Sequence, residues 1–209
     1  MESVEEMITL GWRLYIGKVA GKLLLPENEK MMQLHLAQIF QTLAPLFERQ
    51  PAESIKVLLE APATIRESTR RSIDIVVDHR LAESVKQVAI ELKCFRYLAR
   101  DGGRKRGAQN LGMYDYWEDI ENIEGYCALP SYTAAYQFTL TDDRYYPEGA
   151  HSGPQVAVYS TARSRVEVTG TLKHEIPNRR GEITLRGSYD MSGWRKEGDF
   201  FFIEQRAQA

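Results

Sequence analysis

Cysteine and histidine are scarce in this 209-residue chain, and neither residue type is arranged as a recognisable site. There are two cysteines, Cys94 and Cys127, without CxxC spacing, so we expect buried free thiols in a reducing compartment rather than a disulfide framework. The four histidines make no HxH, HExxH or Cys/His cluster. The sequence therefore gives no support to a zinc site.

Long apolar runs and a dominant charge are missing as well. The acidic N-terminus has no apolar core of signal-peptide length, and no apolar run approaches the length of a membrane span, so we expect a cytoplasmic protein without membrane contact. The net charge is −2, so the overall charge does not point to a polyanion partner. No G-x-S-x-G motif of a serine hydrolase is present. The G-x-x-x-x-G-K-[ST] motif of nucleotide-binding loops is also missing, which argues against an activity driven by nucleotide hydrolysis unless a partner protein supplies it.

What the chain does contain is the composition of an ordinary globular protein. Its hydrophobic content of 43% and charged content of 27% allow a sizeable buried core. The length suits one large domain, or one domain with an appendage.

Two strand-like segments between Ser72 and Phe95 bring charged residues to one place. Their aliphatic residues follow a period of two: Ile73, Ile75 and Val77 in the first, and Val88, Ile90 and Leu92 in the second. Asp74 is therefore expected to point away from its aliphatic neighbours, and Glu91 and Lys93 to point together. If the segments pair as a hairpin, these three side chains share one face of a sheet.

Two carboxylates and an ammonium so close together are the components of a hydrolytic site that uses a divalent cation. Mg²⁺ takes oxygen ligands, typically one or two carboxylates, and a lysine can stabilise negative charge beside it. Burying unpaired charge is costly, so a sheet between helices has no general reason to place three ionisable groups there. The alternative interpretation is an edge strand with a polar outer face.

The order Asp74, sixteen intervening residues, then Glu91-x-Lys93 resembles the PD-(D/E)XK nuclease superfamily, which includes many restriction endonucleases and repair nucleases. Ile73 stands where the motif's name has proline. The resemblance covers roughly residues 27–140 and implies an α/β fold with a restriction-endonuclease-like core, a mixed central sheet flanked by helices. It also implies that Asp74 and Glu91 bind Mg²⁺, for which Mn²⁺ substitutes, together with the backbone carbonyl of Leu92, and that Lys93 orients the attacking water.

A fourth candidate for the site lies upstream, on a predicted helix. Asn28 can cap this helix, and Glu29 then falls in its first turn, where a carboxylate suits the helix dipole. In the superfamily pattern a glutamate on the helix before the first core strand often completes the metal site. Glu29 is our choice for that role, and the alternatives are Glu27, Gln33 and Glu48.

Local basic clusters are the candidates for contact with DNA. The residues expected to contact it are Arg70, Arg71, Arg104, Lys105, Arg106 and Gln109. A solvated surface is the other interpretation of these clusters. Some branches of the superfamily carry a tyrosine four residues after such a glutamine, but Met113 occupies that position here, so we do not assign that branch.

The chain divides into a helical segment at 1–26, a nuclease-like core at 27–145 and a β-rich extension of the same domain at 146–209. Helices are predicted at 3–22, from Asn28 to Leu46, and at 107–124, where Gly125 is the expected stop. Residues 144–154 are predicted as loop, and Pro62 is expected to limit pairing of the first strand. The predicted strands are 55–65, 72–77, 87–95, 132–140, 155–159, 165–172, 181–189 and 200–204.

The functional prediction is a Mg²⁺-dependent endodeoxyribonuclease that acts on double-stranded DNA. One alternative is a catalytically inactive nuclease-like protein that binds DNA or assembles with a partner. Another is an interaction protein in which the charged strand is incidental. A homodimer is compatible with each of these interpretations.

Overall fold

The computed structural model of the chain describes residues 2–66, 69–98, 107, 109–153, 156–173 and 181–208. The larger helices are α1 (Glu2–Ala20), α2 (Glu29–Phe47) and α3 (Gln109–Cys127), and the short helical turns are α4 (Tyr145–Glu148), η1 (Ala157–Tyr159) and η2 (Met191–Gly193). The strands are β1 (Glu53–Arg66), β2 (Thr69–Leu81), β3 (Ser84–Phe95), β4 (Tyr132–Thr141), β5 (Val168–Leu172), β6 (Ile183–Tyr189), β7 (Arg195–Glu197) and β8 (Phe200–Gln208).

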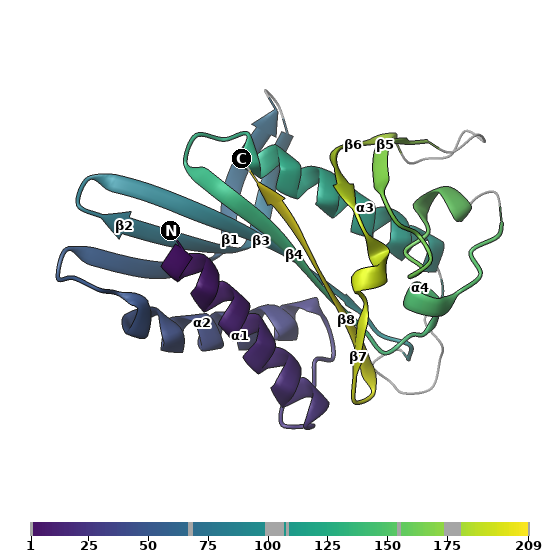
Figure 1. Cartoon of the computed structure of the whole chain (residues 1–209), viewed down its shortest axis with the longest axis horizontal. Helices are drawn as coiled ribbons and strands as arrows, with labels where there is room; N and C mark the ends of the chain where they lie inside the picture. The colour runs from purple at the N-terminus through teal and green to yellow at the C-terminus, as the bar shows by residue number, and fades with distance from the viewer. Residues whose placement is uncertain are drawn as a thin grey trace.

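A six-stranded mixed sheet forms the centre of the molecule, with strand order β1-β2-β3-β4-β8-β7. Strands β3 and β4 run parallel, and the other neighbouring pairs are antiparallel. Parallel neighbours need a crossover, and α3 lies in the segment that connects β3 to β4. Helices α1 and α2 cover one face of the sheet, and α3 covers the other together with the small β5–β6 sheet (Figure 1). The predicted α/β class with a mixed sheet between helices is confirmed.

Each face of the sheet carries its own apolar core. On the side of α1 and α2, Trp12 stacks on Phe138 with ring centroids 4.5 Å apart. On the other side, Trp117 and Ile120 of α3 pack against the sheet and the C-terminal strands. The predicted buried free cysteines are confirmed. Within the described part of the chain, no helix has both the length and the apolar character that crossing a bilayer requires.

The first half of the chain follows the sequence prediction closely. Asn28 caps α2 as expected, because its Oδ1 accepts the N–H of Met31 at 2.9 Å. The predicted hairpin of the second and third strands is confirmed by the antiparallel register of β2 with β3. Pro62, however, does not limit pairing as expected: it lies in the ladder opposite Ser72, on the sheet's outermost strand, where a missing N–H is tolerated.

The second half departs further from the prediction. The prediction of a strand at 155–159 is wrong over the described residues 157–159, which form η1, because their backbone closes local turns instead of pairing with a strand: the N–H of Tyr159 donates to the Val156 carbonyl at 3.1 Å. The Tyr159 carbonyl accepts the indole N–H of Trp117 at 3.0 Å. The loop expected at 144–154 contains α4. Helix α3 continues two residues past Gly125, since the hydroxyl of Tyr126 is anchored inside the protein at Glu91. Strand β8 joins the central sheet beside β4, so the C-terminal extension completes the core.

The close packing of α1 on α2 leads to a stability prediction for two glycines of α1. A Cβ added at Gly11 would lie 2.5 Å from the buried ring of Phe40, whereas one added at the exposed Gly17 meets nothing within 4 Å. Gly11→Ala should therefore lower the free energy of unfolding by about 1–3 kcal/mol. Gly17→Ala should raise it by about 0.5–1 kcal/mol, because alanine loses less backbone entropy in a helix. Urea unfolding followed by circular dichroism measures both, and equal effects would contradict the packing described.

Candidate functional site

The central sheet forks at Asp74. Strands β2 and β3 are paired from Leu81–Ser84 to Ile75–Ile90, and beyond Ile90 strand β3 continues beside β4 while β2 continues beside β1. At the fork, Oδ2 of Asp74 accepts the backbone N–H of Leu92 at 2.9 Å, both groups being buried. A side chain thus takes the place of the strand partner that the Leu92 N–H would otherwise need.

Asp74 and Glu91 form a buried carboxyl pair at this fork. The Glu91 side chain is hydrogen bonded to Asp74, and Oε1 of Glu91 accepts the hydroxyl of Tyr126 at 2.6 Å. Burial raises the pKa of Glu91 well above its ordinary value, and the nearby carboxyls of Asp119 and Asp74 raise it further. Burial also raises the pKa of Asp74. Two carboxyl groups can be hydrogen bonded to each other only if one of them carries a proton, and the raised pKa of both Asp74 and Glu91 favours a proton shared by the pair.

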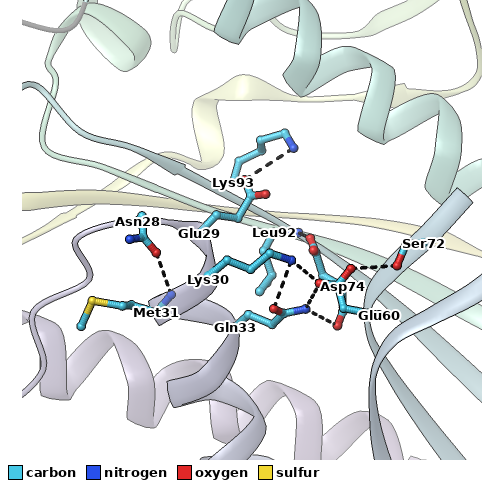
Figure 2. Close-up of polar contacts among 10 residues, drawn as sticks. All are labelled: Asn28, Glu29, Lys30, Met31, Gln33, Glu60, Ser72, Asp74, Leu92 and Lys93. Atoms are coloured by element: carbon cyan, nitrogen blue, oxygen red, sulfur yellow. Dashed lines mark hydrogen bonds and ion pairs between the residues drawn. The ribbon is translucent and has the colours of Figure 1, made fainter. Parts of the chain in front are cut away.

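Lys93 provides the positive charge of the site. Its Nζ lies 2.7 Å from Oδ2 of Asp119. It also lies 3.6 Å from Oε2 of Glu29, in the first turn of α2 (Figure 2). Burial alone would lower the pKa of Lys93, but the carboxylates of Asp119 and Glu29 raise it above its ordinary value. Lys93 is therefore held as an ammonium between α3 and the first turn of α2.

Asp119, on α3, is another buried acid of the site. Burial raises its pKa to about 7 although Lys93 acts in the opposite direction. The pKa of Glu29 is raised as well, mainly by burial. Together with Asp74 and Glu91, these residues make four carboxyl groups near Lys93, and the pKa of each is raised. Such a surplus of acids favours the uptake of protons or of a cation.

The four residues predicted as catalytic are brought together in this arrangement. Asp74, Glu91, Lys93 and Glu29 come from β2, β3 and α2 and meet at the fork. Of the alternatives to Glu29, Gln33 also reaches the site, since its Nε2 donates to the Asp74 carbonyl at 2.7 Å. Glu48 lies elsewhere and accepts the N–H of Ile55 at 2.8 Å.

The predicted DNA contacts are only partly described. Arg104, Lys105 and Arg106, and the side chain of Arg70, lie outside the described residues. Arg71 is half exposed, and its Nη2 lies 3.2 Å from Oε1 of Glu118. Gln109 donates to Oδ2 of Asp143 at 3.3 Å. The contact of these residues with DNA stays a prediction.

Two residues of the site, Asp119 and Tyr126, were not predicted from the sequence. They lie seven residues apart, two turns of α3, so both project from the same side of the helix. Asp119 lies three residues after Tyr116 and directly before Ile120, and the side chains of Tyr116 and Ile120 are fully buried. An acid at an apolar position of a helix is the signal that could have identified Asp119.

One part of the predicted strand geometry is wrong. Ile73 and Ile75 do not share a face: Ile73 belongs to the core under α3, and Ile75 to the core under α1 and α2. The reason lies in the neighbouring strand, where Glu60 falls between the pairs Leu59–Ile75 and Ala61–Ile73 and has left-handed backbone, with φ 52°. The alternation of faces reverses there in both strands.

The donor set at the fork suits a hard cation that keeps its own water. Within the described ranges, no group of three or more His, Cys, Asp or Glu side chains is arranged to hold a metal ion. The carboxyl pair of Asp74 and Glu91 offers two acids, and Mg²⁺ is commonly held by one or two carboxylates with waters in the other positions. The pair therefore fits Mg²⁺ better than a metal that needs an all-protein cage.

Comparison with known proteins adds no relative: no protein-family model, no curated protein and no solved structure matches the chain.

The raised pKa of Asp119 predicts a specific dependence of stability on pH. An unfolded aspartate titrates near 3.9, whereas folded Asp119 titrates near 7. Between these values the folded chain keeps a proton that the unfolded chain has lost, so the free energy of unfolding falls as pH rises from about 4 to about 7. Asp119→Asn removes this contribution, and it also lowers the pKa of Glu91 by removing a repulsion.

Urea unfolding at several pH values tests this expectation. The slope of unfolding free energy against pH should become less negative in Asp119→Asn by up to about 1.4 kcal/mol per pH unit. Asp199→Asn, the same change at an exposed position, is the control and should keep the wild-type slope. An unchanged slope in Asp119→Asn would show that this carboxyl is ionised throughout the range.

Proposed function

We propose that this chain is a metal-dependent nuclease of the PD-(D/E)XK type, with a restriction-endonuclease-like core, that hydrolyses phosphodiester bonds in DNA. The observation that carries the proposal is the convergence of Asp74, Glu91 and Lys93 at the fork between β2 and β3. These residues have the types and the order of the superfamily motif. A contribution to stability alone does not explain why these charged side chains are buried, because buried ion pairs seldom stabilise a fold more than apolar side chains do.

Asp74 and Glu91 would hold Mg²⁺, or Mn²⁺ in its place, with the backbone carbonyl of Leu92 as a further ligand. When bound, the cation would polarise a phosphoryl oxygen and activate a water molecule for attack. The carboxyl pair supports this assignment, because a divalent cation can replace the proton that Glu91 shares with Asp74. The hydroxyl of Tyr126 fixes the orientation of Glu91.

Lys93 would place its charge beside the phosphoryl oxygens and orient the attacking water. Asp119 and Glu29 favour its charged form, and a fixed cation in a buried site stabilises the negative charge that develops during phosphoryl transfer. Asp119 thereby acts through Lys93 as a positioning residue.

A second candidate is a nuclease-like protein that binds DNA or a partner without cutting. The observation that favours it is that Lys93 and Arg71 already have acidic partners, Asp119 and Glu118. Such pairing could leave both cations occupied when a phosphate approaches. The two candidates differ in whether DNA is cleaved.

Two substitutions separate catalysis from folding. Glu91→Gln keeps the volume of the side chain but removes a ligand of the cation, and Lys93→Met keeps the aliphatic stem but removes the ammonium. Both should lower cleavage of duplex DNA by on the order of 10²-fold or more, because each removes an electrostatic contact to the transition state. Glu91→Gln should also abolish the rise in melting temperature with Mn²⁺, whereas Lys93→Met should keep it, since lysine is not a ligand.

The assay is cleavage of supercoiled plasmid and linear duplex at low salt, with Mg²⁺ and then Mn²⁺. Glu83→Gln and Lys56→Met make the same changes at exposed positions and should cut like wild type. Equal cutting by wild type and both site variants would place the active site elsewhere. Binding of DNA without cleavage by wild type would favour the second candidate.

The basic residues predicted to contact DNA give a separate prediction for binding. Neutralising Arg70, Lys105 and Arg106 together should weaken binding of duplex DNA and flatten the plot of log affinity against log salt by about 0.9 per lost phosphate contact. Fluorescence anisotropy at several salt concentrations measures this slope. Neutralising the exposed Lys18, Lys22 and Lys56 is the control. The same slope in both triple variants would show that the three predicted contacts are solvated surface.

A further inference from the structure

The backbone of Asp74 has an unusual partner on the side facing β1. In the register of β1 with β2, Glu60 lies opposite Asp74, between the pairs Leu59–Ile75 and Ala61–Ile73. Glu60 has left-handed backbone, φ 52°, which a residue with a side chain rarely adopts in the middle of a strand. A conformation of this kind persists only where the surroundings enforce it, and it often marks a functional position.

Gln33 occupies the place where strand pairing is disturbed. Its side chain is 4% exposed and reaches from α2 to the two strands (Figure 2). The Nε2 group donates to the backbone carbonyl of Asp74 at 2.7 Å and to Oε1 of Glu60 at 2.8 Å. Both protons of one amide group are thus used to hold the two strands at the fork.

Glu60 is in turn held by several donors. Lys30 pairs with Oε1 of Glu60, and the hydroxyl of Ser72 donates to Oε2 at 2.8 Å. Lys30 and Gln33 lower the pKa of Glu60 to about 2, so the group is a carboxylate at neutral pH. An ionised acceptor strengthens its hydrogen bonds, which offsets the unfavourable backbone of Glu60.

We infer that Gln33, supported by Glu60, is a positioning residue that sets the direction of the Asp74 carboxylate. Gln33 holds the backbone of Asp74 from the side of β1, and the Leu92 N–H holds its carboxylate from the side of β3. Because its backbone carbonyl and its carboxylate are both held, Asp74 directs its carboxyl group toward Glu91. The consequence for cation binding rests on the proposed function, whereas the positioning of Asp74 does not.

The test compares Gln33→Leu, which removes the donor at similar volume, with wild type and with Gln41→Leu, the same change at an exposed position of α2. The first readout needs no metal. Hydrogen exchange of the Leu92 amide should become about tenfold faster in Gln33→Leu, because the Asp74 carboxylate no longer stays on it. The amide of Ile90, where β2 and β3 are paired, should keep its wild-type rate. A merely structural role for Gln33 would change both amides together.

The second readout is the dissociation constant for Mn²⁺, measured by calorimetry. It should rise about 10- to 100-fold in Gln33→Leu, the range found when a residue that orients a metal ligand is lost. Gln41→Leu should bind Mn²⁺ as wild type does. Glu60→Gln, which weakens the acceptor of Gln33, should shift both readouts in the same direction by a smaller factor.

The outcomes distinguish this inference from the proposed function. Unchanged Leu92 exchange in Gln33→Leu would overturn the positioning role even if wild type binds Mn²⁺. If wild type shows no affinity for Mn²⁺ but Leu92 exchange rises selectively, the positioning role stands and the proposed metal chemistry is wrong. A selective rise in Leu92 exchange together with unchanged Mn²⁺ affinity would overturn the link between Gln33 and the cation.

Discussion

The hydrogen bond from the Leu92 N–H to the Asp74 carboxylate is the contact on which the candidate site depends. Where β2 leaves β3, a buried strand N–H loses its partner, and such a group must be satisfied to avoid a desolvation penalty. A carboxylate from the departing strand satisfies it and thereby lies close to Glu91, the residue that precedes Leu92 in β3. The fork in the sheet and the carboxyl pair therefore depend on the same hydrogen bond. It satisfies the Leu92 N–H at the fork, and it holds the Asp74 carboxylate beside Glu91.

The buried ionisable groups around this bond lower the stability of the fold. Burial raises the pKa of Asp74, Glu91 and Asp119, and Lys93 alone does not neutralise them. A fold selected only for stability would place apolar side chains here, because desolvation of several acids outweighs their attraction to one ammonium. Clusters of strongly shifted ionisable groups are typical of functional sites. This is why the arrangement supports a catalytic or binding role more strongly than the sequence motif does alone.

The parts of this site that local pattern encodes could be predicted from the sequence. Period-two alternation placed Glu91 and Lys93 together, and the cap at Asn28 placed Glu29 at the start of α2. Asp119 and Tyr126 were not predicted because the helical period shows which side of α3 is apolar but not which of its residues meet β3 at the fork. Glu60 could not be predicted either: glutamate carries no signal for left-handed backbone, and its conformation is set by donors from α2.

The C-terminal strands hold the helix that carries Asp119 and Tyr126. Glu124 of α3 accepts the N–H groups of Arg186 and Gly187 at 2.8 and 2.7 Å and the hydroxyl of Tyr189 at 2.8 Å, which fastens β6 to the helix. Helix α3 is thus held by the C-terminal strands on one side, while Asp119 and Tyr126 reach the fork on the other. Strand β8 also completes the central sheet beside β4. Residues 181–208 therefore act on the site through the position of α3, although their own sequence carries no motif of the site.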